Sequence, residues 1–425
     1  MKITILTVGT RGDVQPFVAL GQGLKAAGHD VAICTSVTFK PFIEANGLTY
    51  VYMSDDIIRF IDSEAGREAM DKTDNIFAWI KLAIQMTNAM KPVYRRMLDE
   101  EWTAAQGSQA LIYHPKALGG YHIAEKLGIP GFLSLPMPLF VPTAAFPSIV
   151  LPEWNLGGGY NKLSYTVAAS MSQVALGNLI NVWRRETLGL PKRSALASEL
   201  VRPDGQPVPV LHCYSPHVLP EPKDWPETAV VTGYWFLDHH NDWQPSADLL
   251  DFLAAGAPPV YVGFGSISGR DPARTTRAII EALSRTRQRG ILATGWGGLQ
   301  AETLPDSIFK LDAAPHDWLF PRMTAVIHHG GAGTTAAGLR AGVPTIVCPF
   351  FGDQPFWGRR VAALGVGPNP IPQKQLSADA LTAAIRAVST DMTIRRKAVR
   401  LGQKLRQEDG IANAVNFIET MVKKQ

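Results

Sequence analysis

Cysteine is scarce in this sequence: the 425 residues include only Cys34, Cys213 and Cys348. Two of the three lie inside apolar, strand-like runs, and none has the spacing of a metal site or a disulfide framework. We therefore expect reduced, buried thiols in a cytosolic protein. Residues 1–13 form a short apolar strand and a polar turn, and they lack the apolar stretch and cleavage site of a signal peptide.

Charge is also sparse in places. The net charge of +4 is too small to indicate nucleic-acid binding. No charged residue occurs from 129 to 152, a segment with six prolines. Prolines at this density break a helix, so the segment does not indicate a membrane-spanning helix. It predicts a loop that either lines a pocket or touches lipid. Basic residues gather at 395–406, as either a solvated helix face or a patch that contacts an anionic membrane.

The chain is long enough for two domains. A strand at 2–8, a turn, a helix that ends near Gly28 and a strand at 30–35 predict a parallel α/β sheet. The same order starts again with a strand at 259–264. We expect two Rossmann-like, doubly wound domains that face a central cleft, with ligands at the strand carboxyl ends. The predicted parts are a first domain at 1–237, a linker at 238–246, a second domain at 247–408 and a C-terminal helix at 409–425 that packs back on the first domain.

The strongest motif is HHGGAGTT at 328–335, between a strand and a helix. Gly331 and Gly333 let the backbone approach an anion closely, and the helix N-terminus offers unpaired N–H groups. His329 and Thr334 add side-chain donors at the same place. The alternative interpretation is a tight turn needed only for packing.

Two further segments of the second domain carry polar groups after strands. Ser266, in GFGSISG, is placed to touch a phosphate, although the loop is not G-x-G-x-x-G and does not indicate a nicotinamide site. Asp353 and Gln354 follow the strand at 345–349, and a carboxylate beside an amide suits the hydroxyls of a sugar. The alternative role for Asp353 is to cap the next helix.

In the first domain, Asp13 lies in the turn TRGD after the first strand. It is either a helix cap or a carboxylate that accepts the proton of an attacking hydroxyl. A helix N-terminus lowers the pKa of a carboxylate, so such a base receives its proton late, once the hydroxyl oxygen has begun to bond to the sugar.

These motifs together resemble the GT-B, family 1 glycosyltransferases, and among them the sterol 3-β-glucosyltransferases. The most specific stretches are GTRGDVQPFVALGQGLKAAGH at 9–29 and HHGGAGTTAAGLRAGVPTIVCPFFGDQPFWGRRV at 328–361. The resemblance covers essentially the whole chain, and it implies that 1–237 is the acceptor-binding domain and 247–408 the nucleotide-sugar-binding domain. It implies an inverting enzyme that moves glucose from UDP-glucose to a sterol-like hydroxyl, with no cofactor and no metal. The sequence has no Asp-x-Asp motif, which agrees.

The resemblance also implies roles for single residues. Asp13 corresponds to the catalytic base. The donor-binding positions are Ser266, His316, His329, Gly331, Gly333, Thr334, Asp353 and Gln354. Ser266, His329 and Thr334 match residues that bind the diphosphate, with Gly331 and Gly333 shaping the loop. Asp353 and Gln354 match the pair that holds the sugar, and His316 lies in the segment that frames the uracil.

The uridine end departs from the family pattern. Plant relatives stack uracil on a tryptophan where this chain has Ala313, for which Trp318 is a candidate replacement, and hold ribose with a glutamate where it has Ala337. The acceptor side rests on apolar segments at 57–61, 76–90 and 137–146. The alternatives are a transferase for a polyketide, macrolide or glycopeptide aglycone, a nucleotide-sugar epimerase, and a non-catalytic lipid- or sugar-binding module. We expect a cytoplasmic protein, either free or in peripheral contact with a membrane.

Overall fold

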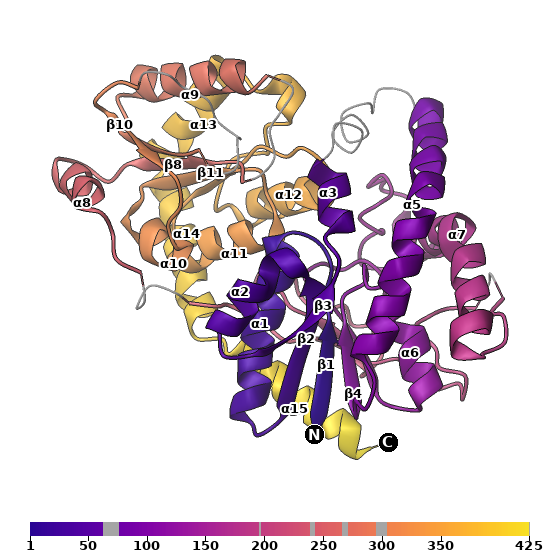
Figure 1. Cartoon of the computed structure of the whole chain (residues 1–425). Helices are drawn as coiled ribbons and strands as arrows, with labels where there is room; N and C mark the ends of the chain where they lie inside the picture. The colour runs from indigo at the N-terminus through magenta and orange to yellow at the C-terminus, as the bar shows by residue number, and fades with distance from the viewer. Residues whose placement is uncertain (63–75, 195–196, 239–242, 266–270, 295–303, 425) are drawn as a thin grey trace. The chain divides into compact units, whose positions relative to one another are not determined.

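A computed structural model describes residues 1–62, 76–194, 197–238, 243–265, 271–294 and 304–424, without the side chains of 61, 62 and 76–88. The chain divides into two compact units. Unit 1 comprises Met1–Pro216, Pro220–Leu237 and Asp409–Gln425, and unit 2 comprises His217–Leu219 and Asp238–Glu408. Each unit is an α/β domain built on a parallel sheet (Figure 1).

The sheet of unit 1 has seven strands in the order β3-β2-β1-β4-β5-β6-β7, and every pairing is parallel. Most of these strands are short, apolar and buried, as expected for a sheet covered on both faces. The strands are β1 (Lys2–Leu6), β2 (Asp30–Ser36), β3 (Thr49–Met53), β4 (Ala110–Tyr113), β5 (Gly131–Leu135), β6 (Val210–His212) and β7 (Ala229–Val231).

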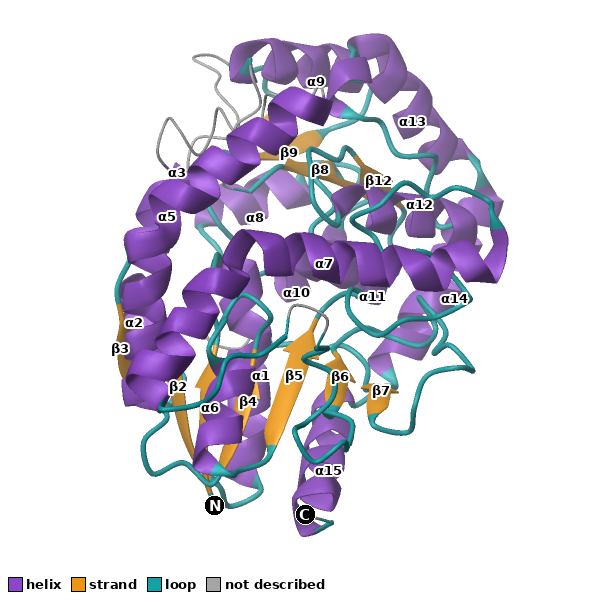
Figure 2. Ribbon diagram, turned by 90° about the vertical axis from the view of Figure 1, so that its right-hand side faces the viewer, coloured by secondary structure: helices purple, strands orange, loops and turns teal. Residues whose placement is uncertain are grey.

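Helices cover both faces of this sheet (Figure 1). One face carries α1 (Arg11–Ala26), α2 (Lys40–Ala45) and α15 (Gly410–Lys423). The other carries α5 (Ile76–Ala104) and α6 (Gly120–Leu127), and α7 (Gly157–Trp183) packs on α5 (Figure 2). Shorter pieces are α3 (Asp56–Asp62), η1 (Val37–Phe39) and η2 (Arg184–Leu188).

Helix α15 joins unit 1 although it comes last in the sequence. Val415 and Ile418 are buried in the same core as residues of α1 and the central strands. At its start the helix is so close to the chain at Gly233 that a Cβ on Gly410 would lie 2.5 Å from the Gly233 carbonyl carbon. The side chain of His29 also lies 3.1 Å from Glu419. The core of unit 1 is therefore assembled from both ends of the chain.

Unit 2 has a five-stranded parallel sheet in the order β10-β9-β8-β11-β12. The strands are β8 (Val260–Gly263), β9 (Gly290–Ala293), β10 (Ile308–Leu311), β11 (Ala325–His328) and β12 (Thr345–Val347). Helices α9 (Pro272–Thr286) and α13 (Ala378–Thr390) cover one face, and α10 (His316–Leu319), α11 (Ala332–Ala341) and α14 (Met392–Arg406) cover the other (Figure 1). The remaining elements are α8 (Ala247–Ala254), α12 (Gln354–Leu364), η4 (Phe320–Arg322) and η5 (Gln373–Gln375).

The strand order reverses once in each sheet, between β1 and β4 in unit 1 and between β8 and β11 in unit 2. Loops leave such a reversal point in opposite directions, which opens a crevice at the carboxyl ends of the strands where ligands bind. Asp13 follows β1, and His329 follows β11. The two central motifs of the sequence therefore lie at the reversal points of their own sheets.

Candidate functional site

Asp13 is held at the start of α1 by the backbone of its own turn. Thr10 precedes the helix, and its N–H donates to Asp13 Oδ2 at 2.8 Å. The Thr10 hydroxyl lies 3.2 Å from the same oxygen, and Thr7 Oγ1 donates to the Asp13 carbonyl at 2.8 Å. Asp13 thus occupies the third helical position of a capping box whose N-cap is Thr10, so its carboxylate takes part in capping α1.

A second group of residues reaches the other carboxylate oxygen from the loop after β4. Lys116 Nζ donates to Asp13 Oδ1 at 2.8 Å. The Lys116 N–H donates to Nδ1 of His114 at 3.2 Å, so the imidazole carries its proton on Nε2, which lies 3.7 Å from Asp13 Oδ1. Neither His114 nor Lys116 is predicted from the sequence. Their only signal is that they follow β4, which pairs with β1.

The local charges keep Asp13 ionised. Burial by itself raises the pKa of the Asp13 carboxyl, but Lys116 and the Thr10 amide outweigh it, and the pKa lies below its usual value. Burial lowers the pKa of His114 to about 4, so at neutral pH this ring is uncharged and we assign the lowering at Asp13 to Lys116. The Asp13 side chain is 14% exposed and that of Lys116 is 53% exposed. The ammonium is thus the partner that can leave the carboxylate most readily.

Gly9 leaves the space in which this carboxylate lies. Its φ of +132° is a conformation that glycine tolerates and L side chains rarely adopt. A Cβ at this position would lie 2.2 Å from Asp13 Oδ2. The glycine in GTRGD is therefore needed for the position of the carboxylate as well as for the turn.

In unit 2, the chain turns sharply between β11 and α11. Gly330 has a φ of +94°, and a Cβ there would lie 2.5 Å from Val347 Cγ1. Its N–H donates to His328 Nδ1 at 2.9 Å, which fixes the turn. No described side chain caps the N-terminus of α11 at Gly331. The first-turn N–H groups of this ten-residue helix, including that of the exposed Gly333, therefore form the kind of positive end that binds anions.

His329 and Thr334 flank this helix end. A Cβ on Gly331 would lie 2.6 Å from His329 Nε2, so the imidazole lies directly against the start of the helix. Among the described residues its buried Nδ1 has no hydrogen-bond partner, and burial lowers the pKa of the ring to about 4. His329 is thus neutral at pH 7 with one N–H to donate. Thr334 is half-buried in the first turn of α11.

The loop after β8 lies beside the same histidine. Gly265, with a φ of +64°, would place a Cβ 3.6 Å from His329 Cε1. The two loops at the reversal point of unit 2 therefore meet at His329. Ser266, the predicted phosphate contact, lies outside the described residues.

Asp353 and Gln354 organise the start of α12. Asp353 Oδ2 accepts a hydrogen bond from the Trp357 indole at 2.9 Å. Gln354 is buried, and its Oε1 accepts the backbone N–H groups of Phe350 at 2.8 Å and Phe351 at 3.3 Å. No described side chain caps α12. The carboxylate and the amide are thus adjacent and held in fixed positions, and the predicted contact with a sugar stays a prediction.

The uridine-side residues lie around α10. His316 stacks on Phe320, with ring centroids 4.2 Å apart and planes 15° apart. Trp318, the candidate replacement for a stacking tryptophan, packs against Trp243 at 5.0 Å and has the Arg322 guanidinium 4.0 Å from its ring centroid. Ala313 is exposed and Ala337 is half-buried. Tyr261 of β8 contacts both the His316 and the Phe320 ring, so His316 belongs to an aromatic cluster, and the role of Trp318 stays a prediction.

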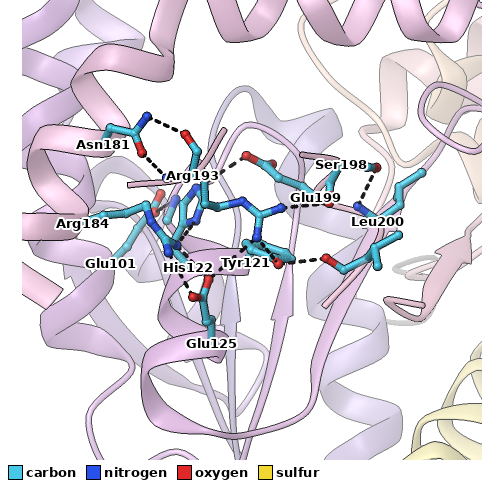
Figure 3. Close-up of polar contacts among 12 residues, drawn as sticks. Glu101, Tyr121, His122, Glu125, Asn181, Arg184, Arg193, Ser198, Glu199 and Leu200 are labelled. Carbon is cyan, nitrogen blue, oxygen red and sulfur yellow. Dashed lines mark hydrogen bonds and ion pairs between the residues drawn. The ribbon is translucent and has the colours of Figure 1, made fainter. Parts of the chain in front are cut away.

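A buried polar cluster in unit 1 joins α6 to the segment after α7 (Figure 3). The Arg184 side chain, 1% exposed, donates to both Glu125 oxygens at 2.8 and 2.9 Å and lies 2.8 Å from His122 Nδ1. Arg193 binds the Tyr121 hydroxyl and the Ser198 carbonyl. Since its charges are paired, this cluster is structural. The described residues contain no group of His, Cys, Asp and Glu placed to hold a metal ion, and none of the described helices has the length and hydrophobicity to cross a membrane.

The comparisons with known proteins match both units. Residues 3–146 match the glycosyltransferase family 28 N-terminal domain, and residues 293–418 match the erythromycin biosynthesis protein CIII-like C-terminal domain. A sterol 3-beta-glucosyltransferase of Arabidopsis thaliana, UGT80A2, is 40% identical over 98% of the chain. The sterol 3-beta-glucosyltransferase of Aspergillus terreus is also 40% identical over 98% of the chain. The chain spans 64% of the plant protein and 30% of the fungal one.

Solved structures share the fold at low identity. The glycotransferase of kitacinnamycin superposes with a TM-score of 0.73 at 19% identity, over 99% of both chains. The calicheamicin glycosyltransferase CalG4 gives a TM-score of 0.71 at 18% identity, over 99% of this chain and 97% of its own. The spinosyn rhamnosyltransferase SpnG, in complex with thymidine diphosphate, gives a TM-score of 0.64 at 20% identity, over 99% of this chain and 100% of its own. These similarities show the GT-B fold and confirm the fold class predicted from the sequence.

Proposed function

This chain belongs to the GT-B glycosyltransferases, and from that premise we propose that it moves glucose from UDP-glucose to the hydroxyl of a sterol-like acceptor, inverting the anomeric carbon without a metal or cofactor. The observation that carries the proposal is the state of Asp13: an ionised carboxylate at the reversal point of the unit 1 sheet, fixed by its own turn. The sterol 3-beta-glucosyltransferases that match 98% of the chain support the donor and the acceptor class.

Unit 2 supplies the donor site in this proposal. The first-turn N–H groups of α11 bind the diphosphate, with Gly331 and Gly333 giving access and His329 and Thr334 donating from the sides. Ser266 adds a hydroxyl to the same group. Negative charge grows on the diphosphate as the bond to the sugar breaks, and donors already fixed in position stabilise that charge most in the transition state.

Other residues of unit 2 bind the two ends of the donor. Asp353 and Gln354 take the sugar hydroxyls, for which their fixed positions at the start of α12 are suitable. His316, stacked on Phe320, frames the uracil. A flat ring pair of this kind can extend a stack with a nucleobase.

Unit 1 supplies the base. The acceptor oxygen forms a bond to the anomeric carbon while the bond from that carbon to the diphosphate oxygen breaks, and UDP leaves. The hydroxyl proton passes to Asp13. Because the pKa of this carboxylate lies below its usual value, the transfer completes only after the attacking oxygen has become acidic through bonding to the sugar.

The acceptor is a flat, apolar molecule in this proposal, in keeping with the uncharged, proline-rich segment at 129–152. Such acceptors reside in membranes, so we further propose that the protein works in the cytoplasm in peripheral contact with lipid. A second candidate acceptor is a polyketide, macrolide or glycopeptide aglycone. The match of residues 293–418 to an erythromycin-biosynthesis domain favours it.

The deciding experiment combines two variants with an acceptor panel. Asp13→Ala should lower kcat by about 10²–10⁴-fold, while UDP affinity measured by calorimetry stays unchanged. His329→Ala should weaken UDP binding instead. The parent protein is offered sterols and polyketide aglycones with UDP-glucose, UDP-galactose and a TDP-sugar, and the products are weighed by mass spectrometry. An Asp13→Ala protein that turns over at the parental rate would refute the assignment of the base.

A further inference from the structure

Unit 1 exposes a band of apolar side chains along α7 and the loop before it. Seven of the 15 large apolar residues exposed in the described chain lie between 150 and 174, with relative exposures from 41% to 85%. We call this band the α7 surface; it consists of Val150, Trp154, Leu156, Leu163, Val167, Met171 and Val174.

The helical members share one side of α7. Leu163, Val167, Met171 and Val174 are four, four and three residues apart, which places them on one face. The opposite face holds the buried Tyr165 and Trp183, and it packs on unit 1. A surface helix of a water-soluble domain presents polar residues on its outer face. Helix α7 instead is apolar on both faces, so its outer face is suited to a non-aqueous neighbour.

The preceding loop is fixed to α7, so the surface is preformed. The Ser148 N–H donates to Ser164 Oγ at 2.7 Å, and the Tyr160 hydroxyl donates to the Pro152 carbonyl at 2.5 Å. The ring of Trp154 lies 5.7 Å from that of Tyr160. The loop that contains Val150 and Trp154 is therefore fixed to the helix by hydrogen bonds.

Charge distinguishes among possible neighbours. The 27 residues of α7 contain no acidic residue and one basic residue, Lys162, which already pairs with Asp224 at 3.1 Å. The helical part of the surface thus offers no charge pattern by which a protein partner would be recognised, and it has no charge to lose by entering hydrocarbon. The loop part contains one charged residue between 150 and 156, Glu153, which lies next to Trp154 in the sequence. A tryptophan at the edge of the surface is typical of a membrane interface.

We propose that the α7 surface docks the protein on a lipid bilayer, with the helix lying in the plane of the membrane and its outer face in the apolar region beneath the headgroups. The proposal deepens the proposed function, because it names the surface through which the enzyme meets the membrane that holds its acceptor. Docking of this kind depends on apolar contact and not on anionic lipid. Binding of the protein to vesicles should therefore depend only weakly on salt.

The test is co-sedimentation of the full chain with phosphatidylcholine vesicles that contain no sterol, at 50 and 500 mM NaCl. The double variant Met171→Asp/Val174→Asp should lower the partition coefficient at least about tenfold. Each substitution places a charge where the docked protein would bury an apolar side chain in the bilayer. The matched control is Met392→Asp/Val399→Asp on α14 of unit 2, whose side chains are similarly exposed at 53% and 48%. Its partition coefficient should equal that of the parent. Thermal unfolding of all three proteins checks that they are folded.

Each outcome decides the question. Parent protein that stays in solution with these vesicles overturns the proposal, and so does equal binding of the two double variants. A parental dimer that Met171→Asp/Val174→Asp dissociates, without vesicle binding, assigns the surface to a second copy and also overturns it. Sterol dispersed in detergent separates this proposal from the function: vesicle binding without transfer to dispersed sterol removes the sterol acceptor and leaves the docking surface standing.

Discussion

Substituting Gly9 by alanine tests the catalytic role of Asp13 without touching Asp13. The new Cβ would lie 2.2 Å from Asp13 Oδ2 and 2.7 Å from its Cγ. Unbonded carbon and oxygen atoms approach no closer than about 3.3 Å, so the carboxylate must move by roughly 1 Å. The backbone at φ +132° adds strain of about 1–3 kcal/mol for any residue other than glycine.

A displacement of this size has a large kinetic effect. Misplacing a reacting group by about 1 Å costs on the order of 10²-fold in rate. The Gly9→Ala protein should therefore lose about 10²-fold in kcat. Its affinity for UDP should be unchanged, because the substituted turn belongs to unit 1 and the proposed diphosphate site to unit 2. Steady-state kinetics with UDP-glucose and a sterol, together with calorimetry of UDP binding, measure both quantities.

The same turn provides a matched control. Gly12 lies three residues further on, within α1, and a Cβ there has only Thr10 Oγ1 at 3.7 Å as a neighbour. Gly12→Ala should keep the parental kcat and stabilise the protein by about 0.5–1 kcal/mol, since alanine favours the helix. If Gly9→Ala turns over as fast as Gly12→Ala, the carboxylate position does not matter for the reaction and the assignment of the base fails.

Three further predictions concern the groups around the site and the core. Lys116→Met removes the cation that lowers the pKa of the base, so the acidic limb of the kcat/KM profile should move to higher pH; an unmoved limb would argue against the ion pair. Burial raises the pKa of Glu101 from 4.5 to about 8, so the stability that its neutral form provides is complete below about pH 4.5 and is lost as the pH rises to about 8. Thermal unfolding from pH 5 to 9 should show this decline in the parent and not in Glu101→Gln. Arg184→Met removes both hydrogen bonds from the partly buried Glu125 carboxylate and leaves it only Arg193, 4.0 Å away, so it should cost about 3 kcal/mol in urea unfolding. Arg185→Met, at a side chain 56% exposed, should stay within about 0.5 kcal/mol of the parent.

Local signals in the sequence predicted the parts of the site that are contiguous along the chain. The strand, turn and helix around Asp13 follow from a buried strand, glycines and helical spacing, and the same holds for the turn that contains Gly330. His114 and Lys116 could not be found in this way. Their place beside Asp13 depends on β4 pairing with β1, which is a non-local property of the strand order.

Helix α7 was not predicted either, for a different reason. It begins with three glycines, which are poor helix formers, and apolar residues occur on both of its faces. A helix of this composition has no amphipathic period for sequence reasoning to detect. Its identification depends on the packing of Tyr165 and Trp183 on unit 1.

The return of α15 to the first unit has consequences for biosynthesis and for protein engineering. During translation, the N-terminal domain cannot complete its hydrophobic interior until residues 409–424 have left the ribosome, because Val415 and Ile418 form part of it. A fragment ending at Leu237 would expose that interior and aggregate. Chimeras that exchange donor domains between enzymes of this fold should therefore carry the last helix with the recipient's N-terminal half, so that two junctions are cut instead of one.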